Sequence, residues 1–276
     1  MKILIANPGS TSYKCKLYEV TDLPDNQVDM KVLFQANVER IGDKEGIYSF
    51  SFGGEEKGKI NLEIPDYFYA INLSLKSIGE KFLIEEVAAV GFKTVLAKRI
   101  SGCVELTDDV VKAMEDYRLL APVHTDVYIT AISVFKKILK NTPLVGLFET
   151  HFHKEIPPEA YLYGIPYEFY EKYGIRKYGF HGASHRFIGM RAKELFGANK
   201  VISCHLGGSS SVCAIKNGFS IDTSMGMSPQ SGLLQAKRVG DFDAYALLYL
   251  MKKENLSIEE TENLLMAKGG IYGLSG

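Results

Sequence analysis

Two short turns in this sequence carry residues of the kind that bind phosphate. The first runs from Asn7 to Ser12 and the second surrounds Gly208, and both contain glycine followed by small hydroxyl residues. Such turns let N–H and O–H groups converge on an anion. Neither has the spacing of a P-loop or a dinucleotide fold, so the repetition favours a two-lobed kinase or ATPase, with ordinary hairpin turns as the alternative. The two segments align at one constant spacing, which pairs Ile3 with Ile202, Gly9 with Gly208, Ser10 with Ser209, and Ser12 with Ser211.

Three residues near the middle of the chain have a spacing that a metal site could use. Glu149, His151 and His153 would share one face if residues 148–153 were extended. Patterns this short are weakly specific. We therefore prefer the simpler interpretation, in which this segment is the polar end of a strand facing a cleft.

His181 and His185 lie four residues apart, around Gly182 and Ser184. Serine is a favoured helix N-cap, so we expect Ser184 to cap a helix that ends at Gly197. The two histidines then flank a helix start, unlike the pair on an H-E-x-x-H metalloprotease helix. No G-x-S-x-G string occurs, which argues against a serine hydrolase of the nucleophile-elbow type.

Arg238 lies in a glycine-containing loop without strand or helix periodicity. An isolated loop arginine is usually solvated. Here the loop also contains Asp241 and Asp243, and this setting suits a guanidinium group aimed into a cleft.

The hydrophobic pattern predicts the elements that must position these residues. Short spacings between the early strands indicate an antiparallel meander, with Gly58 as a breaker, and Asn217-Gly218 indicates a hairpin turn. A break at Pro157-Pro158 suggests two lobes, residues 1–150 and 151–276. Strands are expected at 2–6, 13–20, 32–41, 46–52, 59–64, 87–92, 143–148, 200–205, 212–215 and 219–222. Helices are expected to begin at or after Asp66, Thr107, Thr125, Pro166, Ser184 and Ser257.

The composition is that of a soluble globular chain. Of the 276 residues, 46% are hydrophobic and 24% charged, and the net charge is −1. These values argue against disorder and against a nucleic-acid partner. The apolar runs are too short for a membrane span or a signal peptide, so we expect a cytoplasmic protein. Four cysteines without a C-x-x-C pair are interpreted as buried thiols.

Longer strings in the sequence resemble the signatures of the acetate kinase family, in the same order and with suitable spacing. The resemblance covers essentially all 276 residues. It implies an α/β chain with the duplicated, two-lobed ribonuclease H-like fold of actin-like ATPases. The implied activity is reversible ATP-dependent phosphorylation of a short-chain carboxylate, acetate first, to an acyl phosphate. The strings are NPGSTSYK, YLYGIPYEFYEKYGIRKYGFHGASH, HLGGSSSVCAIKNGFSIDTSMGMSP and GLLQAKRVGDFD.

The same resemblance implies roles for individual residues. Asn7 would hold Mg²⁺, Glu149 would have an acid/base or metal-organising role, and His181 and Arg238 would stabilise the transferring phosphoryl group. The nucleotide would contact Ser10, Ser12, Lys14, His205, Leu206, Gly207, Gly208 and Ser209. The carboxylate substrate would contact Lys93, Val95, Val123, His124, Phe180 and Pro229.

Three positions depart from the family pattern. Phe92-Lys93 stands where the family has His-Arg, so a point charge replaces a two-pronged carboxylate clamp. Glu149 stands where the family has aspartate, and Gly208 where it has asparagine. These departures keep a non-catalytic nucleotide-binding homologue as an alternative. Propionate or butyrate stays as an alternative substrate because the sequence does not set the size of the acyl pocket.

The resemblance also carries expectations about assembly. Family members commonly form homodimers, and they continue well beyond the string that ends at Gly276. We therefore expect an incomplete second lobe and weak nucleotide binding by this chain alone, with a separate chain as one way of completing the lobe.

Overall fold

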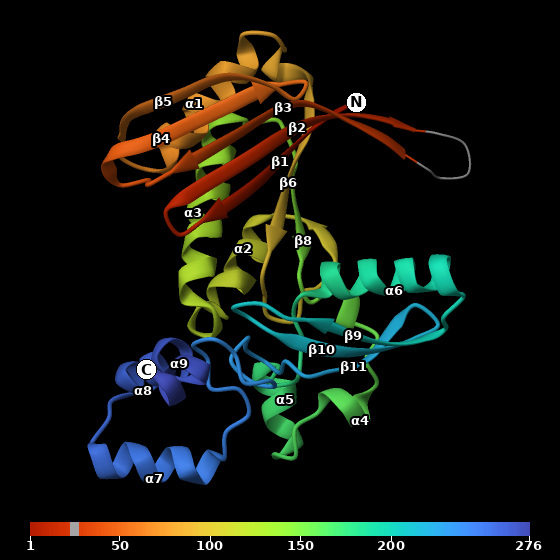
Figure 1. The fold of residues 1–276 in the computed structure, drawn as a ribbon, viewed down its shortest axis with the longest axis vertical. Helices are drawn as coiled ribbons and strands as arrows, with labels where there is room; N and C mark the ends of the chain where they lie inside the picture. Colours follow the sequence, from red (N-terminus) through yellow and green to blue (C-terminus); the bar gives the residue numbers. More distant parts are fainter. Residues whose placement is uncertain (23–27) are drawn as a thin grey trace. The chain divides into compact units, whose positions relative to one another are not determined.

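Strands with one apolar face build the sheet of the first unit, Met1–Phe148, in the computed structural model, which describes residues 1–22 and 28–276. The strand order is β5-β4-β3-β2-β1-β6-β8-β7 (Figure 1). The first five strands form the antiparallel meander that was expected, but Gly58 lies inside β5, where the pairing with β4 shifts register, and does not end the strand. The strands are β1 (Lys2–Gly9), β2 (Ser12–Asp22), β3 (Val28–Glu39), β4 (Asp43–Phe52), β5 (Glu55–Ile64), β6 (Val87–Thr94), β7 (Cys103–Glu105) and β8 (Leu144–Phe148).

Capping residues start two of the helices in this unit as expected. Asp66 accepts a hydrogen bond from the Tyr69 N–H, and Thr107 accepts one from the Val110 N–H. The expected cap at Thr125 is wrong, because α3 already begins at a proline and Thr125 is buried within the helix. The helices are α1 (Tyr67–Gly79), η2 (Ile84–Glu86), α2 (Asp108–Glu115), η3 (Arg118–Leu120) and α3 (Pro122–Ile138).

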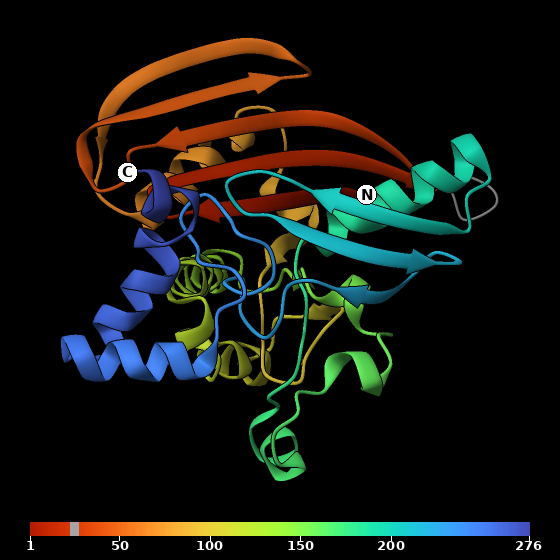
Figure 2. The ribbon, with the colours of Figure 1, turned by 60° about the horizontal axis from the view of Figure 1, so that its bottom comes forward.

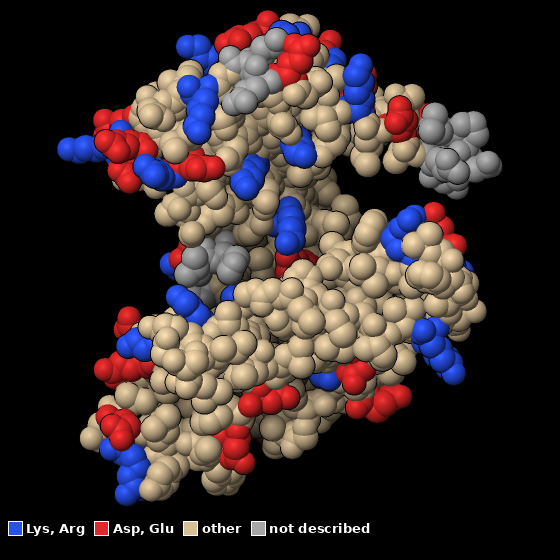
Figure 3. All heavy atoms as spheres, viewed as in Figure 1, with Lys and Arg blue, Asp and Glu red and all other residues tan. Residues whose placement is uncertain are grey.

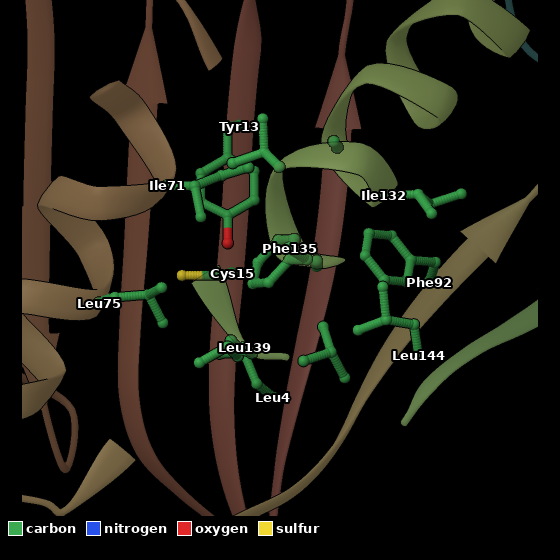
Figure 4. Packing of buried hydrophobic residues seen from close by; sticks show 14 of the residues in the cluster. Leu4, Tyr13, Cys15, Ile71, Leu75, Phe92, Ile132, Phe135, Leu139 and Leu144 are labelled. Atoms are coloured by element: carbon green, nitrogen blue, oxygen red, sulfur yellow. The ribbon is translucent and has the colours of Figure 1, made fainter. Parts of the chain in front are cut away.

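The core of the first unit lies between one face of the sheet and helices α1 and α3 (Figure 4). Tyr13 and Cys15 from β2 meet Ile71 of α1 and Phe135 of α3 there, and Phe92 of β6 packs edge-on against Phe135 at 5.5 Å between ring centres. Side chains alternate between the faces of a strand. The outer face of the sheet therefore carries exposed polar residues, including Asn7, Lys14 and Lys93.

The second unit, Glu149–Gly276, has a three-stranded sheet in the order β11-β10-β9. Asn217 and Gly218 both have positive φ, which is the backbone of the predicted hairpin turn. The strands are β9 (Lys200–His205), β10 (Ser211–Lys216) and β11 (Phe219–Thr223). The helices are η4 (His151–His153), α4 (Pro158–Tyr161), α5 (Tyr167–Tyr173), α6 (Gly182–Phe196), α7 (Ala244–Glu254), α8 (Ile258–Asn263), the π-helical η5 (Leu264–Lys268) and α9 (Gly270–Ser275).

Several helix ends of the second unit confirm the cap predictions. Gly174 and Gly197 adopt left-handed backbone and close α5 and α6, and Ser257 forms a capping box with Glu260 at the start of α8. Helices α7 to α9 lie to one side of the three-stranded sheet in both views (Figure 1 and Figure 2). Helix α7 buries none of its residues.

Each unit contains one of the two phosphate-type turns, and each turn joins the two strands of a hairpin. The second strand of each hairpin, β2 or β10, begins at one of the serines that align in the sequence, Ser12 and Ser211. The turns differ in length, because β1 extends to Gly9 while β9 ends at His205 and leaves residues 206–210 as a loop. The duplication seen in the sequence is thus a duplication of structure, with the second turn enlarged.

Acidic and basic side chains are interspersed over both units on the face shown in Figure 3.

The four cysteines differ in exposure. Cys15 and Cys213 are buried, but Cys103 and Cys204 are exposed, so the expectation of four buried thiols was wrong for two. Burial raises the pKa of the Cys15 thiol to about 11. Among the described residues, no helix has the length and apolarity to cross a membrane.

Candidate functional site

The candidate residues of the first unit gather around the β1–β2 hairpin. Asn7 and Lys14 are directly opposite each other in the ladder, and both line a pocket of about 660 Å³ on the outer face of the sheet. The hydroxyl of Tyr67 donates to the Gly9 carbonyl, and that of Tyr128 donates to Asn7 Oδ1 at 3.3 Å. These bonds tie the hairpin to α1 and α3.

The other candidates of the first unit occupy different elements. Ser10 lies in the hairpin turn, Lys93 near the end of β6, and Val95 just after it against the core. Val123 and His124 belong to the first turn of α3, but their side chains lie outside the described part of the structure.

His181 is the centre of the second unit's candidate residues. It is the N-cap of α6 and has φ 58° and ψ 25°, a left-handed conformation that is rare for a residue with a side chain. The next residue, Gly182, donates its N–H to the Glu149 carbonyl at 3.1 Å. The preceding residue, Phe180, is buried. The backbone thus brings Glu149, Phe180 and His181 together.

Ser184 is not the helix cap that was expected. The helix begins earlier, at Gly182, and the Ser184 hydroxyl instead lies 2.9 Å from Nδ1 of His205. The ring of His205 stacks on that of His181 at 3.9 Å between centres. This places the first residue of the second phosphate-type turn beside His181.

The expectation that residues 148–153 are extended was wrong. They leave β8 and form the helical turn η4, in which His153 is fully buried. Nε2 of His153 donates to the Phe180 carbonyl at 2.9 Å, because a carbonyl can only accept, and Nδ1 then accepts from Ser220 Oγ at 2.8 Å. Burial lowers the pKa of His153 to about 4. His153 therefore supports the backbone next to His181, and no sequence signal beyond the histidine itself indicated this.

Arg238 reaches the second turn. Its Nη1 donates to Ser209 Oγ at 2.9 Å and to the Pro229 carbonyl at 3.4 Å, and desolvation lowers the pKa of the guanidinium. The alternative of a fully solvated arginine is thereby excluded. Pro229 is itself buried.

Gln235 also holds the second turn and was missed by the sequence analysis. Its Oε1 accepts from the Ser210 N–H at 3.3 Å, and its Nε2 donates to the Pro229 carbonyl at 2.9 Å. The adjacent Ala236 N–H donates to the Gly208 carbonyl at 3.3 Å. A buried glutamine thus fixes the turn at the same place where the arginine meets it.

The second unit therefore assembles an anion-binding arrangement from distant segments. A guanidinium group, two imidazole rings and a turn of small residues converge from the 228–240 loop, the start of α6 and the end of β9. Such donors stabilise charge on phosphoryl oxygens.

Comparison with known proteins gives a consistent result. The family model described as the acetokinase family matches residues 2–276. The chain belongs to the acetokinase family. It is 43% identical to the acetate kinase of Thermoanaerobacterium thermosaccharolyticum and 40% identical to that of Bacillus subtilis, covering all of this chain and 70% of each relative.

Solved structures of acetokinases share the fold. The acetate kinase of Porphyromonas gingivalis is 34% identical with a TM-score of 0.80, and the propionate kinase of Francisella tularensis is 30% identical with a TM-score of 0.85. Each comparison covers all of this chain and 70% of the other. The predicted fold class, the actin-like ATPase fold in two lobes, is confirmed. As expected from the family resemblance, this chain spans only part of its relatives, 70% of each of these two solved chains.

One departure from the acetokinase pattern has a structural explanation. Phe92 faces the core and contacts Phe135, whereas Lys93 alternates to the exposed face. The aromatic residue therefore extends the packing of β6 on α3, and Lys93 is the one of the two that is exposed on the outer face.

Gly182→Ala is expected to destabilise the protein by roughly 1–3 kcal/mol. A Cβ at this position would lie 2.3 Å from the Glu149 carbonyl oxygen, so either that hydrogen bond or the left-handed turn at His181 must move. Urea denaturation followed by circular dichroism measures the loss. Gly164→Ala, whose Cβ meets nothing within 4 Å, is the control and should change stability little. Equal stability of both variants would contradict the expectation.

Proposed function

We propose that this chain catalyses the reversible, ATP-dependent phosphorylation of a short-chain carboxylate, with acetate as the first substrate to test. The contact of Arg238 with Ser209 carries the proposal within the structure, since it puts a cation on the second phosphate-type turn. Membership of the acetokinase family and relatives named acetate kinase support the same activity. Phosphoryl transfer needs positioned donors far more than covalent help from the protein.

In the proposed reaction, Arg238 and His181 stabilise the charge of the phosphoryl group as it moves from ATP to the carboxylate oxygen. The second turn, His205, Leu206, Gly207, Gly208 and Ser209, contacts the nucleotide phosphates through backbone N–H groups. Ser10, Ser12 and Lys14 contact them from the first hairpin. Glu149, whose carbonyl holds Gly182, has an acid/base or metal-organising role.

We propose Mg²⁺ as the metal and Asn7 as its protein ligand. Asn7 is an exposed residue, and its amide oxygen accepts one hydrogen bond from Tyr128 and has a second lone pair for a cation. This donor set fits Mg²⁺, which kinases bind through few protein oxygens together with water and phosphate. When bound, the ion neutralises charge on the phosphate oxygens.

The carboxylate substrate is proposed to bind at Lys93, with Val95, Val123, His124, Phe180 and Pro229 around its alkyl group. Lys93→Arg is expected to lower KM for the acid about 3- to 10-fold, because a guanidinium can bind a carboxylate through two hydrogen bonds. Initial rates against acid concentration measure the change. Lys98→Arg, at a partly exposed lysine that pairs with Asp116, is the control. Loss of turnover with the fold intact would show that Lys93 has a different role.

An acyl hydroxamate assay tests the proposed activity. The protein is incubated with ATP, Mg²⁺ and acetate, propionate or butyrate, and hydroxylamine traps the acyl phosphate. Acetate is expected to give the highest kcat/KM. Propionate is the second candidate, because the chain also matches a solved propionate kinase with a TM-score of 0.85. Nucleotide binding without product from any acid would instead support a non-catalytic nucleotide-binding homologue.

A homodimer, a separate chain that completes the second unit, and a cytoplasmic location are further proposals. The proposal of a separate chain is supported by an open edge of the second unit's sheet, where a further strand could pair. Strand β1 pairs with both β2 and β6, whereas its counterpart β9 pairs, among the described residues, with β10 alone. Light scattering after size-exclusion chromatography measures the mass and tests for a partner.

A further inference from the structure

A line of hydrogen-bonded side chains runs through the second unit and ends on His181. Ser203 Oγ lies 2.9 Å from Nδ1 of His185, and Nε2 of that ring lies 2.7 Å from Ser211 Oγ. Ser211 Oγ also lies 2.8 Å from Nδ1 of His181. Ser203, His185 and Ser211 are at most 2% exposed, so these polar groups depend on one another for hydrogen bonds.

The elements around the line explain how it forms. His181 is the N-cap of α6 and His185 lies in its first turn, and the centres of the two rings are 6.4 Å apart. Ser203 and Ser211 come from the neighbouring strands β9 and β10. Ser211 is the counterpart of Ser12 in the duplicated hairpin, but it is completely buried between two histidines.

The number of protons limits the line to two arrangements. A serine hydroxyl has one proton and two lone pairs, and the two rings are the partners of Ser211 Oγ among the described residues. If Ser211 accepted from both rings, its buried proton would have no acceptor, so it donates to one ring and accepts from the other. A neutral imidazole has one N–H and one bare nitrogen. In the first arrangement, every donor points toward His181: Ser203 donates to His185 Nδ1, His185 Nε2 donates to Ser211, and Ser211 donates to His181 Nδ1. The proton of His181 then lies on Nε2.

In the second arrangement, every bond is reversed. His181 Nδ1 donates to Ser211, Ser211 donates to His185 Nε2, and His185 Nδ1 donates to Ser203. The hydroxyl proton of Ser203 then needs another acceptor, and the described residues provide none within hydrogen-bond distance. A buried donor without a partner is costly, so the first arrangement is favoured.

We propose that Ser203, His185 and Ser211 are positioning residues that hold His181 neutral with its proton on Nε2. The inference rests on the proposed function only for the use of this proton, which would be donated to a phosphoryl oxygen in the transition state. The ring of His181 is turned so that Nδ1 faces the buried line. Nε2 lies at the opposite side of the imidazole from the buried line.

The groups around the line favour a neutral His185 ring. His205 stacks on His181, and the His153 and His185 rings are 5.9 Å apart between centres. Burial, followed by the influence of His153, His181 and His205, lowers the pKa of His185 to about 3, so this ring stays uncharged near neutral pH. Protonation of His181 at Nδ1 would have to reverse all three hydrogen bonds.

Long-range proton–nitrogen NMR spectra of the ¹⁵N-histidine-labelled chain test the proposal without any assay of turnover. At pH 7.5 the wild-type spectrum should show a protonated Nε2 and a bare Nδ1 for both His181 and His185. In Ser211→Ala, His181 should become a mixture of both tautomers. Ser203→Ala removes the hydroxyl that donates to His185 Nδ1, so it should give mixed tautomers as well.

Ser220→Ala is the matched control for these variants. Ser220 is likewise buried and lies 2.8 Å from a histidine Nδ1, that of His153, but it lies outside the line. It should leave the His181 tautomer unchanged. A wild-type His181 protonated on Nδ1 would overturn the proposal even if no variant folded, and so would a Ser211→Ala spectrum in which His181 behaves as in the wild type.

Kinetics connects the line to the proposed function. If acyl phosphate is formed, Ser211→Ala should lower kcat about tenfold near pH 8 with little change in KM for ATP, and Ser211→Thr, which keeps the hydroxyl, should restore most of the rate. A protein with the expected tautomers but no turnover would contradict the proposed function and leave the line intact. Turnover that is equal in Ser211→Ala and the wild type would contradict the use of the Nε2 proton.

Discussion

Arg238→Ala is expected to lower kcat for acyl phosphate formation by about 10³-fold or more while KM for ATP changes only a few-fold. The guanidinium is held by Ser209 and by the Pro229 carbonyl, so it is aimed before substrate binds and loses little freedom in the reaction. Its charge is most useful when the phosphoryl oxygens carry the most charge, which is in the transition state. Steady-state rates at saturating and limiting ATP separate the two constants.

His181→Ala belongs to the same prediction and is expected to lower kcat by about 10² to 10³, the usual loss for one transition-state donor. Lys237→Ala removes a neighbouring exposed cation and is the control for general charge effects. Thermal melts of all variants check that folding is retained. Unchanged kcat in both Arg238→Ala and His181→Ala would exclude these residues from the chemistry.

Features set by neighbouring residues could be predicted from the sequence. The short spacings between the early strands predicted a meander. Asp66, Thr107 and Ser257 are caps because the groups they bond are at most three residues away. The Asn217-Gly218 turn is local in the same way. The predicted helix start at Thr125 was wrong because two local signals competed there, and the proline three residues earlier began the helix instead.

The supporting residues of the candidate site could not be predicted in this way. His153 is linked to Ser220, which is 67 residues away, and Ser210 is linked to Gln235 over 25 residues. Such pairs depend on how elements pack, and a single histidine or glutamine in a sequence does not name its partner. The motif strings identified the residues proposed to contact ligands, whereas the supporting hydrogen bonds of His153, His185 and Gln235 became visible only in the fold.

The two buried histidines predict a steep loss of stability in mild acid. Burial lowers the pKa of His153 to about 4 and that of His185 to about 3, compared with a value near 6.5 in an unfolded chain. Above pH 6.5 both states are neutral and these residues add no pH dependence. Below pH 6.5 the unfolded chain binds protons at these two residues and the folded chain does not. The free energy of unfolding therefore falls until the pH approaches the folded pKa values.

The expected loss between pH 7.5 and pH 5 is roughly 4 kcal/mol for the two residues together, or about 2 kcal/mol for each. Urea denaturation at a series of pH values, followed by circular dichroism, measures it. The double variant His153→Gln, His185→Gln cannot take up these protons, so it should be less stable at pH 7.5 but should have a much flatter pH dependence. His151→Gln, in the same turn η4 but only partly buried, should retain most of the wild-type slope. A wild-type stability that is level between pH 7.5 and pH 5 would mean that these imidazoles accept protons in the folded state, which their hydrogen bonds to Phe180, Ser203 and Ser211 argue against.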